Sequence, residues 1–275
     1  MQLNASEDIL QAIKDAIRFA ATDEGLMKRR GELVRFVAET FLVAGSELHA
    51  LGHIVATDRI DGTSPCGHGS DEAVGVSILF RIAAQLTSAS ADLFRDGRSY
   101  AAAALVRQIV EIEYLAWAME TKDREGERWL RSDRALRESF FTPAKLRKAA
   151  QRKFRGKDFG YHCEIGGHAV PAPSILLGGD NAMSQLLLVD LLGHVGRIWD
   201  HLVGWASASP HGGPILTRKQ QMLEKVITWK SLDPLAEPAP PTQPIKGVHP
   251  PIKSINPKEN IVAAINESKM RQEVG

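Results

Sequence analysis

The segment NAMSQLLLVDLLGHVGRIWDHLVGWA, residues 181–206, is the longest apolar stretch of the chain and the best guide to its fold. Its leucines, valines and isoleucine recur at steps of three and four residues, a spacing that predicts a helix. Five ionisable side chains interrupt it: Asp190, His194, Arg197, Asp200 and His201. Such interruptions argue against a membrane span, so we expect a buried helix of a globular protein.

The same periodicity extends outward from this segment over most of the chain. It predicts further helices over residues 4–20, 26–55, 71–94, 99–120, 142–157 and 217–229, and a densely charged helix over 123–140. Thr142 and Pro143 form a typical helix start. Alternating β-branched runs are missing. The sequence therefore predicts an all-α fold, an antiparallel helical bundle with additional helices.

Composition excludes several classes of protein. The 275 residues include 34 Lys and Arg against 33 Asp and Glu, a net charge of +1, and only two cysteines. A surface built wholly for nucleic acid and a disulfide framework are both excluded, although a local basic patch is not. The opening MQLNASEDILQAIKDAI has no basic region before an apolar core, so we expect a cytoplasmic protein without a secretory signal or membrane span.

Proline is concentrated at the C-terminus, where eight of the 14 prolines follow Ser231. Because proline fixes φ and removes a backbone donor, we predict a helical domain over residues 1–230 and an extended arm over 231–275, with a short helix at 258–269. The arm is either a disordered tail or a segment that binds a protein partner or a second copy of the chain. Its apolar anchors would be Ile245, Val248, Ile252 and Ile255.

Charged residues recur on one face of the helix predicted over 99–120. Arg107, Glu111 and Tyr114 are spaced four and three residues apart among Ala, Leu, Ile and Val. A charge in apolar surroundings needs a partner, so we expect an Arg107–Glu111 pair with Tyr114 beside it. The group is either a structural network or the wall of a ligand site.

A second polar stripe, Asp190, His194, Arg197 and His201, follows the same helical spacing in residues 181–206. On the helix over 26–55, His49 and His53 are also four residues apart. Hydrogen-bonded interior histidines are the default interpretation, and we expect no cofactor. A metal held by His49, His53, Asp190 and His194 is the alternative.

Basic residues without any acid fill residues 142–157. They are Lys145, Arg147, Lys148, Arg152, Lys153, Arg155 and Lys157. Leu146, Ala150 and Phe154 form an apolar stripe beneath them, so the segment predicts a basic amphipathic helix that either attracts phosphate or faces an acidic neighbour.

Two histidines follow this basic segment. Arg155 and His162 lie seven positions apart, and His168 precedes two prolines. A histidine can move a proton at the ribose 2′-hydroxyl while an arginine stabilises the charge on phosphorus, so this combination is compatible with RNA cleavage without a metal. The glycines at 156, 160, 166 and 167 allow close approach to a ligand or simply mark turns.

These motifs together resemble two families. The order of Arg107, Glu111 and Tyr114, then Trp129 and Ser132, then the segment from Tyr161 to His168, resembles a family of uncharacterised bacterial all-helical proteins over about residues 71–205. The pair Arg155 and His162 resembles the Arg-x4–6-His motif of the HEPN superfamily, helical bundles that often dimerise and cleave RNA. The first resemblance implies His168 as the functional histidine, and the second implies His162.

The resemblances imply a HEPN-like protein of a defence or toxin–antitoxin type that acts as a metal-independent ribonuclease and forms a homo-oligomer. His162 or His168 would transfer protons, Arg155 and Arg107 would contact phosphate, and Glu111 would orient them. RNA would also contact Lys148, Arg152, Tyr114 and Tyr161. The alternative is a non-enzymatic scaffold whose C-terminal arm binds a partner or a second subunit.

Overall fold

The computed structural model describes residues 4–54, 69–121, 125–151, 153–154, 158–167, 171–178 and 181–236. Every regular element within these ranges is a helix, which confirms the all-α prediction. The chain divides into two units, Met1–Ala236 and Glu237–Gly275. The predicted arm beyond residue 236, with its four apolar anchors and its short helix, lies outside the described residues.

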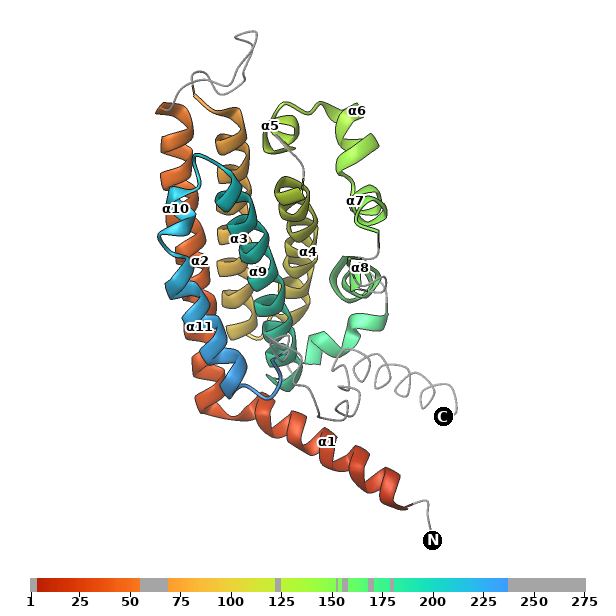
Figure 1. Ribbon diagram of the computed structural model, residues 1–275. Helices are drawn as coiled ribbons and strands as arrows, with labels where there is room; N and C mark the ends of the chain where they lie inside the picture. The colour runs from red at the N-terminus through yellow and green to blue at the C-terminus, as the bar shows by residue number, and fades with distance from the viewer. Residues whose placement is uncertain are drawn as a thin grey trace, which may run out of the picture. The chain divides into compact units, whose positions relative to one another are not determined.

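Four long helices form the bundle (Figure 1). They are α2 (Glu24–Ile54), α3 (Asp71–Arg95), α4 (Ser99–Thr121) and α9 (Asn181–Ala208). The first three follow one another in antiparallel order, as predicted. The fourth, α9, runs parallel to α4. Ser99 at the start of α4 bonds to Ser184 near the start of α9, and Glu120 near the end of α4 bonds to His201 further along α9. The long connection over residues 122–180 makes this parallel pairing possible.

The start and end of α3 show how the sequence sets helix boundaries. The Ser70 hydroxyl accepts a hydrogen bond from the Ala73 amide at 3.2 Å, and Asp71 and Glu72 place negative charge in the first turn. Beyond Arg95 the backbone turns through Gly97, whose φ of 71° lies in the left-handed region that glycine tolerates. The predicted helix start near Asp71 is confirmed.

Helices α2 and α3 pack closely along an apolar seam. A Cβ atom on Gly45 of α2 would lie 2.8 Å from the Phe80 Cβ of α3, so a larger residue would push the helices apart. Phe41 contacts Phe80 edge-on at 5.3 Å between ring centroids and stacks on Trp199 of α9 at 6.0 Å. This seam is the apolar core of the bundle.

Within the described residues, α3 is also the one helix long and apolar enough to cross a membrane, and 61% of its most apolar stretch is buried inside the bundle. Its buried side chains pack against α2, α4 and α9. This burial is what the core helix of a soluble protein shows.

Short helical segments form the connection between α4 and α9. They are α5 (Glu125–Leu130), α6 (Arg134–Leu136), the π-helical turn η1 (Arg137–Phe141), α7 (Pro143–Ala149), α8 (Asp158–His162), the π-helical turn η2 (Cys163–Gly167) and the 3₁₀-helix η3 (Ala172–Gly178). The charged helix predicted over 123–140 is interrupted, because Asp133 accepts a hydrogen bond from the Leu136 amide at 2.7 Å and starts a new helix. The basic helix starts at Pro143 as predicted but ends at Ala149 instead of residue 157, and Gln151 then adopts a φ of 46°.

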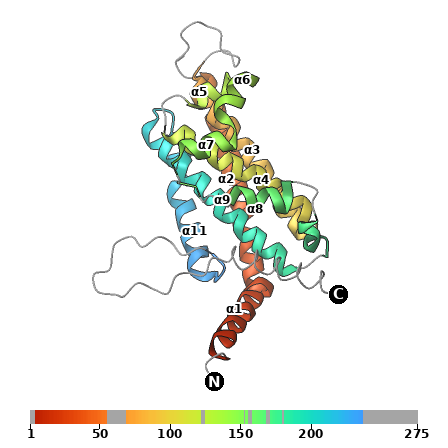
Figure 2. The ribbon, with the colours of Figure 1, turned by 90° about the vertical axis from the view of Figure 1, so that its right-hand side faces the viewer.

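Three further helices complete the described unit: α1 (Asn4–Thr22), α10 (Gly213–Leu216) and α11 (Lys219–Leu232). The last turn of α1 packs on the bundle through the buried Ala20 and Ala21, and the rest of α1 extends past the bundle end (Figures 1 and 2). After α11, Asp233 and Leu235 are also buried. The packed chain therefore continues past residue 230, where the sequence predicted the helical domain to end.

Candidate functional site

Polar side chains line the seam between the parallel helices α4 and α9. Glu113 of α4 bonds to His194 and Arg197 of α9, and one heptad further along Glu120 bonds to His201 at 2.6 Å. The predicted polar stripe on residues 181–206 is therefore real, and its partner on α4 is acidic. This seam contrasts with the apolar one between α2 and α3.

A cluster of three side chains lies at this seam: His162 at the end of α8, and Asp190 and His194 of α9. The Nε2 atoms of the two histidines are 3.0 Å apart. Asp190 Oδ2 lies 3.3 Å from His162 Nε2, and Asp190 Oδ1 lies 3.7 Å from His194 Nε2. Only 2%, 10% and 0% of the side chains of His162, Asp190 and His194 are exposed, so imidazole and carboxylate groups converge in the interior. We call these three residues the His–Asp–His cluster.

Glu113 and Arg197 hold one member of this cluster in place. Glu113 Oε2 lies 2.6 Å from His194 Nδ1, and Glu113 Oε1 accepts a hydrogen bond from Arg197 Nε at 2.8 Å. Burial alone would raise the pKa of Glu113, but the hydrogen bond from His194 and the charges of His194 and Arg197 lower it to about 2. The ionised carboxylate can only accept, so the shortest contact assigns the Nδ1 proton of His194 to the bond with Glu113, although Arg197 Nη2 also lies 2.8 Å from Nδ1.

Close backbone packing places His162 against the bundle. A Cβ atom on Gly166 of η2 would lie 2.3 Å from the Ala103 carbonyl carbon of α4, so this position has no room for a side chain. Of the glycines considered in the sequence, Gly166 and Gly167 approach α4 closely, whereas a Cβ atom on Gly160 would meet nothing within 4 Å. The close approach that these glycines allow is thus to the protein's own helix.

Arg107 and Glu111 form the predicted ion pair on α4, at 2.8 Å. Their side chains are 31% and 32% exposed, so the pair lies at the surface edge of the helix and not in a dry interior. The guanidinium of Arg107 also lies over the Phe159 ring of α8, 5.6 Å from its centroid, and the Arg147 guanidinium of α7 lies 5.8 Å from the same ring.

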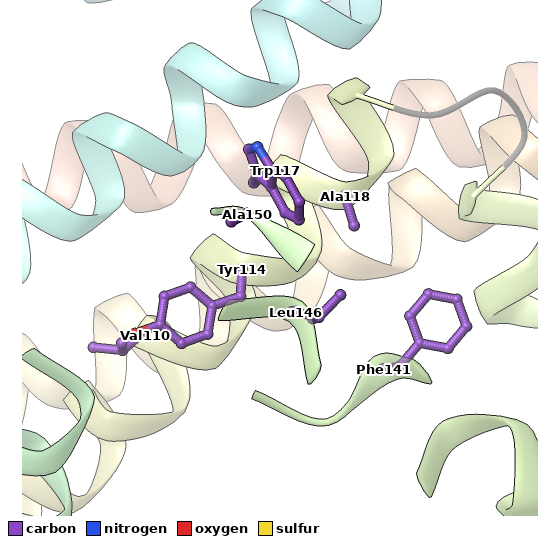
Figure 3. Packing of buried hydrophobic residues seen from close by; sticks show 7 residues of the cluster. All are labelled: Val110, Tyr114, Trp117, Ala118, Phe141, Leu146 and Ala150. Atoms are coloured by element: carbon purple, nitrogen blue, oxygen red, sulfur yellow. The ribbon is translucent and has the colours of Figure 1, made fainter. Parts of the chain in front are cut away.

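Tyr114 belongs to the core. Its side chain lies in an apolar cluster that packs α7 against α4 (Figure 3). The members of that cluster are Val110, Tyr114, Trp117, Ala118, Phe141, Leu146 and Ala150. Only 1% of Tyr114 is exposed, and its ring centroid lies 4.3 Å from that of Phe154, so a ligand cannot reach it without displacing the cluster.

The remaining predicted site residues are distributed differently. Lys148 of α7 is exposed, and Tyr161 of α8 is half-buried with its ring centroid 5.0 Å from that of His162. Arg152, Arg155 and His168 lie outside the described residues. The structure therefore brings together Arg107 and Glu111 on one face, and His162 with Asp190 and His194 in the interior.

His49 and His53 do not form the four-residue cluster considered with Asp190 and His194. Their rings contact each other on α2 at 4.6 Å between centroids, and His49 Nδ1 lies 3.0 Å from the Ser77 hydroxyl of α3. Burial, followed by the charges of His53 and Arg81, lowers the pKa of His49. Among the described residues, one group of three side chains could hold a metal ion. Its members are His162, Asp190 and His194, so His162 takes the place of His49 and His53.

Glu113 was missed in the sequence, although a signal for it exists. Glu113 and Glu120 are seven residues apart, as are His194 and His201, and each acid pairs with the corresponding histidine. Matching heptad spacings on two helices are what parallel packing with polar contacts requires. The sequence does not reveal that the helices are parallel, so this match carried no meaning before the fold was known.

Comparisons of the chain with family models, with curated proteins and with solved structures find no match. The function must therefore be inferred from the geometry of these two polar regions.

Proposed function

We propose that this chain is a HEPN-like bacterial helical protein of a defence or toxin–antitoxin type, which acts in the cytoplasm on RNA as a metal-independent ribonuclease. One observation carries the binding half of the proposal: the guanidinium groups of Arg107 and Arg147 lie 5.6 and 5.8 Å from the centroid of the Phe159 ring. Single-stranded RNA is held by arginines that contact phosphate and by planar groups that stack on bases.

The charges around Phe159 suit an RNA strand. The bond between Arg107 and Glu111 is half-exposed, so a phosphate oxygen can replace the carboxylate without a new burial of charge. Lys145 and Lys148 are exposed and add positive charge to α7, the helix that carries Arg147. We call Arg107, Arg147, Lys148 and Phe159 the basic–aromatic face.

The catalytic half of the proposal concerns the histidines. Because only 2% of His162 is exposed, an RNA backbone would reach it only after α8 moved. We therefore assign proton transfer to His168, with Arg155 as the residue that stabilises the charge on phosphorus.

RNA binding and cleavage by the purified chain test this proposal. We expect binding that weakens with salt. The double variant Arg147→Glu and Lys148→Glu should lower the slope of log K against log salt by about 1.4, which is about 0.7 for each cation on a single strand. The matched control is Lys219→Glu at the exposed start of α11, which should bind as the wild type does.

With EDTA present, cleavage should persist in the wild type and be lost in His168→Ala. Absence of RNA binding by the folded wild type would contradict the proposal.

A second candidate, a non-enzymatic interaction protein, is favoured by α1. This helix extends past the bundle (Figure 2), and Phe19 near its end is 68% exposed. An exposed aromatic residue at the point where this helix leaves the bundle suits the surface of a second copy of the chain. Phe19→Asp should then reduce the molar mass measured in solution from that of an oligomer to that of a monomer. A wild type that is already monomeric would rule this candidate out.

A further inference from the structure

We propose that the His–Asp–His cluster is a structural site for a divalent transition metal, with Zn²⁺ as the ion that fits it best. The ligands would be the Nε2 atoms of His162 and His194 and one carboxylate oxygen of Asp190, and a water molecule would complete the tetrahedron. This inference does not rest on the RNA proposal, because it uses only the interior contacts of His162, Asp190 and His194, although α8 carries both His162 and Phe159 of the basic–aromatic face.

The distances among the candidate ligand atoms agree with those around a tetrahedral ion. Ligands that bind one such ion at about 2.0–2.1 Å lie about 3.3 Å from one another. His162 Nε2 lies 3.0 Å from His194 Nε2 and 3.3 Å from Asp190 Oδ2, and both distances are close to that value. One ligand atom from each of the three residues lies within 4.8 Å of the other two. Two imidazoles and one carboxylate are also the donor set that zinc and its neighbours in the first transition row accept.

The surroundings of His194 support the same conclusion. A ligating histidine typically donates its other ring N–H to a carboxylate, which fixes the ring and makes the ligand nitrogen more basic. Glu113 accepts at 2.6 Å from His194 Nδ1 and is itself held by Arg197 at 2.8 Å. The His194 Nε2 lone pair is thereby aimed at His162 and Asp190.

The position of the cluster in the chain indicates what the ion would do. His162 belongs to the connection between α4 and α9, whereas Asp190 and His194 are one turn apart on α9. A metal bound by all three would fasten the end of α8 to the bundle. The burial of both histidines makes this a stabilising role, because substrate has no open path to the ion.

Cobalt titration of the untagged protein tests this site. After treatment with a chelator, the wild type should take up one Co²⁺ per chain, with the ligand-field absorption of a tetrahedral site, and Zn²⁺ should displace it. His162→Gln and His194→Gln should lose this absorption, and Glu113→Gln should weaken the Kd for Co²⁺ by about 10- to 100-fold. The matched control is His49→Gln, which removes a half-buried histidine from the other pair and should leave uptake unchanged.

Two results would overturn the proposal: no uptake by the folded wild type, or equal uptake by the wild type and both histidine variants. Loss of uptake in His49→Gln alone would place the ion on α2 and would also refute it. Circular dichroism establishes whether each variant folds. If a variant does not fold, the Tm of the wild type tests the proposal instead. Zn²⁺ should raise this Tm, and EDTA should reverse the rise.

Discussion

Two buried polar clusters of this molecule are built on opposite plans. In the first, Arg30 of α2 meets Asp233 after α11 in a two-pronged ion pair, with bonds of 2.6 Å from Nε and 2.8 Å from Nη2. The same guanidinium donates to the Ala20 carbonyl and to Gln185, and Trp229 donates to Asp233. In the second, the His–Asp–His cluster, two imidazoles and a carboxylate converge on each other.

The difference lies in the balance of donors and acceptors. Around Arg30 every bond joins an N–H donor to an oxygen acceptor, so the first cluster is complete as a structural unit. In the second, two ring nitrogens face each other at 3.0 Å, so either one neutral histidine donates its N–H to the other or a metal ion takes the place of that proton. We therefore expect only the second cluster to respond to metal ions.

Removal of Arg30 should give the largest effect. Arg30→Ala leaves the carboxylate of Asp233 buried without its cation, and we expect the free energy of unfolding to fall by about 3–5 kcal/mol. Urea unfolding followed by circular dichroism measures this change. The matched control is Arg134→Ala, which breaks an exposed pair with Glu138 and should leave the midpoint unchanged. Equal effects of the two variants would contradict the comparison.

The second-largest effect should be the stabilisation by metal ions, which should depend on the His–Asp–His cluster and not on the Arg30 cluster. Zn²⁺ at about a hundred times its Kd should raise the free energy of unfolding of the wild type by about 2.7 kcal/mol. The conservative variant Arg30→Lys, although destabilised, should show the same increase, because its histidines are intact. His194→Gln should show none. Thermal unfolding with and without EDTA measures all three, and an increase retained in His194→Gln would disprove the assignment.

The packing of η2 on α4 should give the smallest effect. Gly166→Ala places a Cβ atom against the Ala103 carbonyl, and we expect a loss of about 1–3 kcal/mol. Gly160→Ala is the control, since its Cβ atom meets nothing within 4 Å and alanine favours a helix. Chemical unfolding measures the free energy of unfolding of both variants. Equal values for Gly166→Ala and Gly160→Ala would show that η2 does not pack on α4.

Much of the fold was predictable because it depends on local rules. Apolar periodicity located the long helices and the start of α3 near Asp71, and Pro143 in the first turn marked the start of α7. The early end of α7 was not predictable, because the left-handed backbone at Gln151 leaves no mark in the composition of the segment.

The sites were only partly predictable, because they depend on contacts between distant segments. The Arg107–Glu111 pair has a spacing of four residues within one helix and was correctly predicted. Arg30 and Asp233 are 203 positions apart, and Asp233 lies in the segment that its prolines marked as an arm. The sequence likewise suggested His49 and His53 as companions of Asp190 and His194, because spacing cannot show which helix faces which.

The central claim is that the His–Asp–His cluster holds a metal ion while the Arg30 cluster is a closed ion pair. Anomalous X-ray scattering at the zinc edge, from crystals grown with Zn²⁺, tests it most directly. We predict one peak about 2.0–2.2 Å from His162 Nε2, His194 Nε2 and an Asp190 oxygen. A peak at His49 and His53 instead, or none in the interior while the two Nε2 atoms stay in hydrogen-bond contact, would contradict the account.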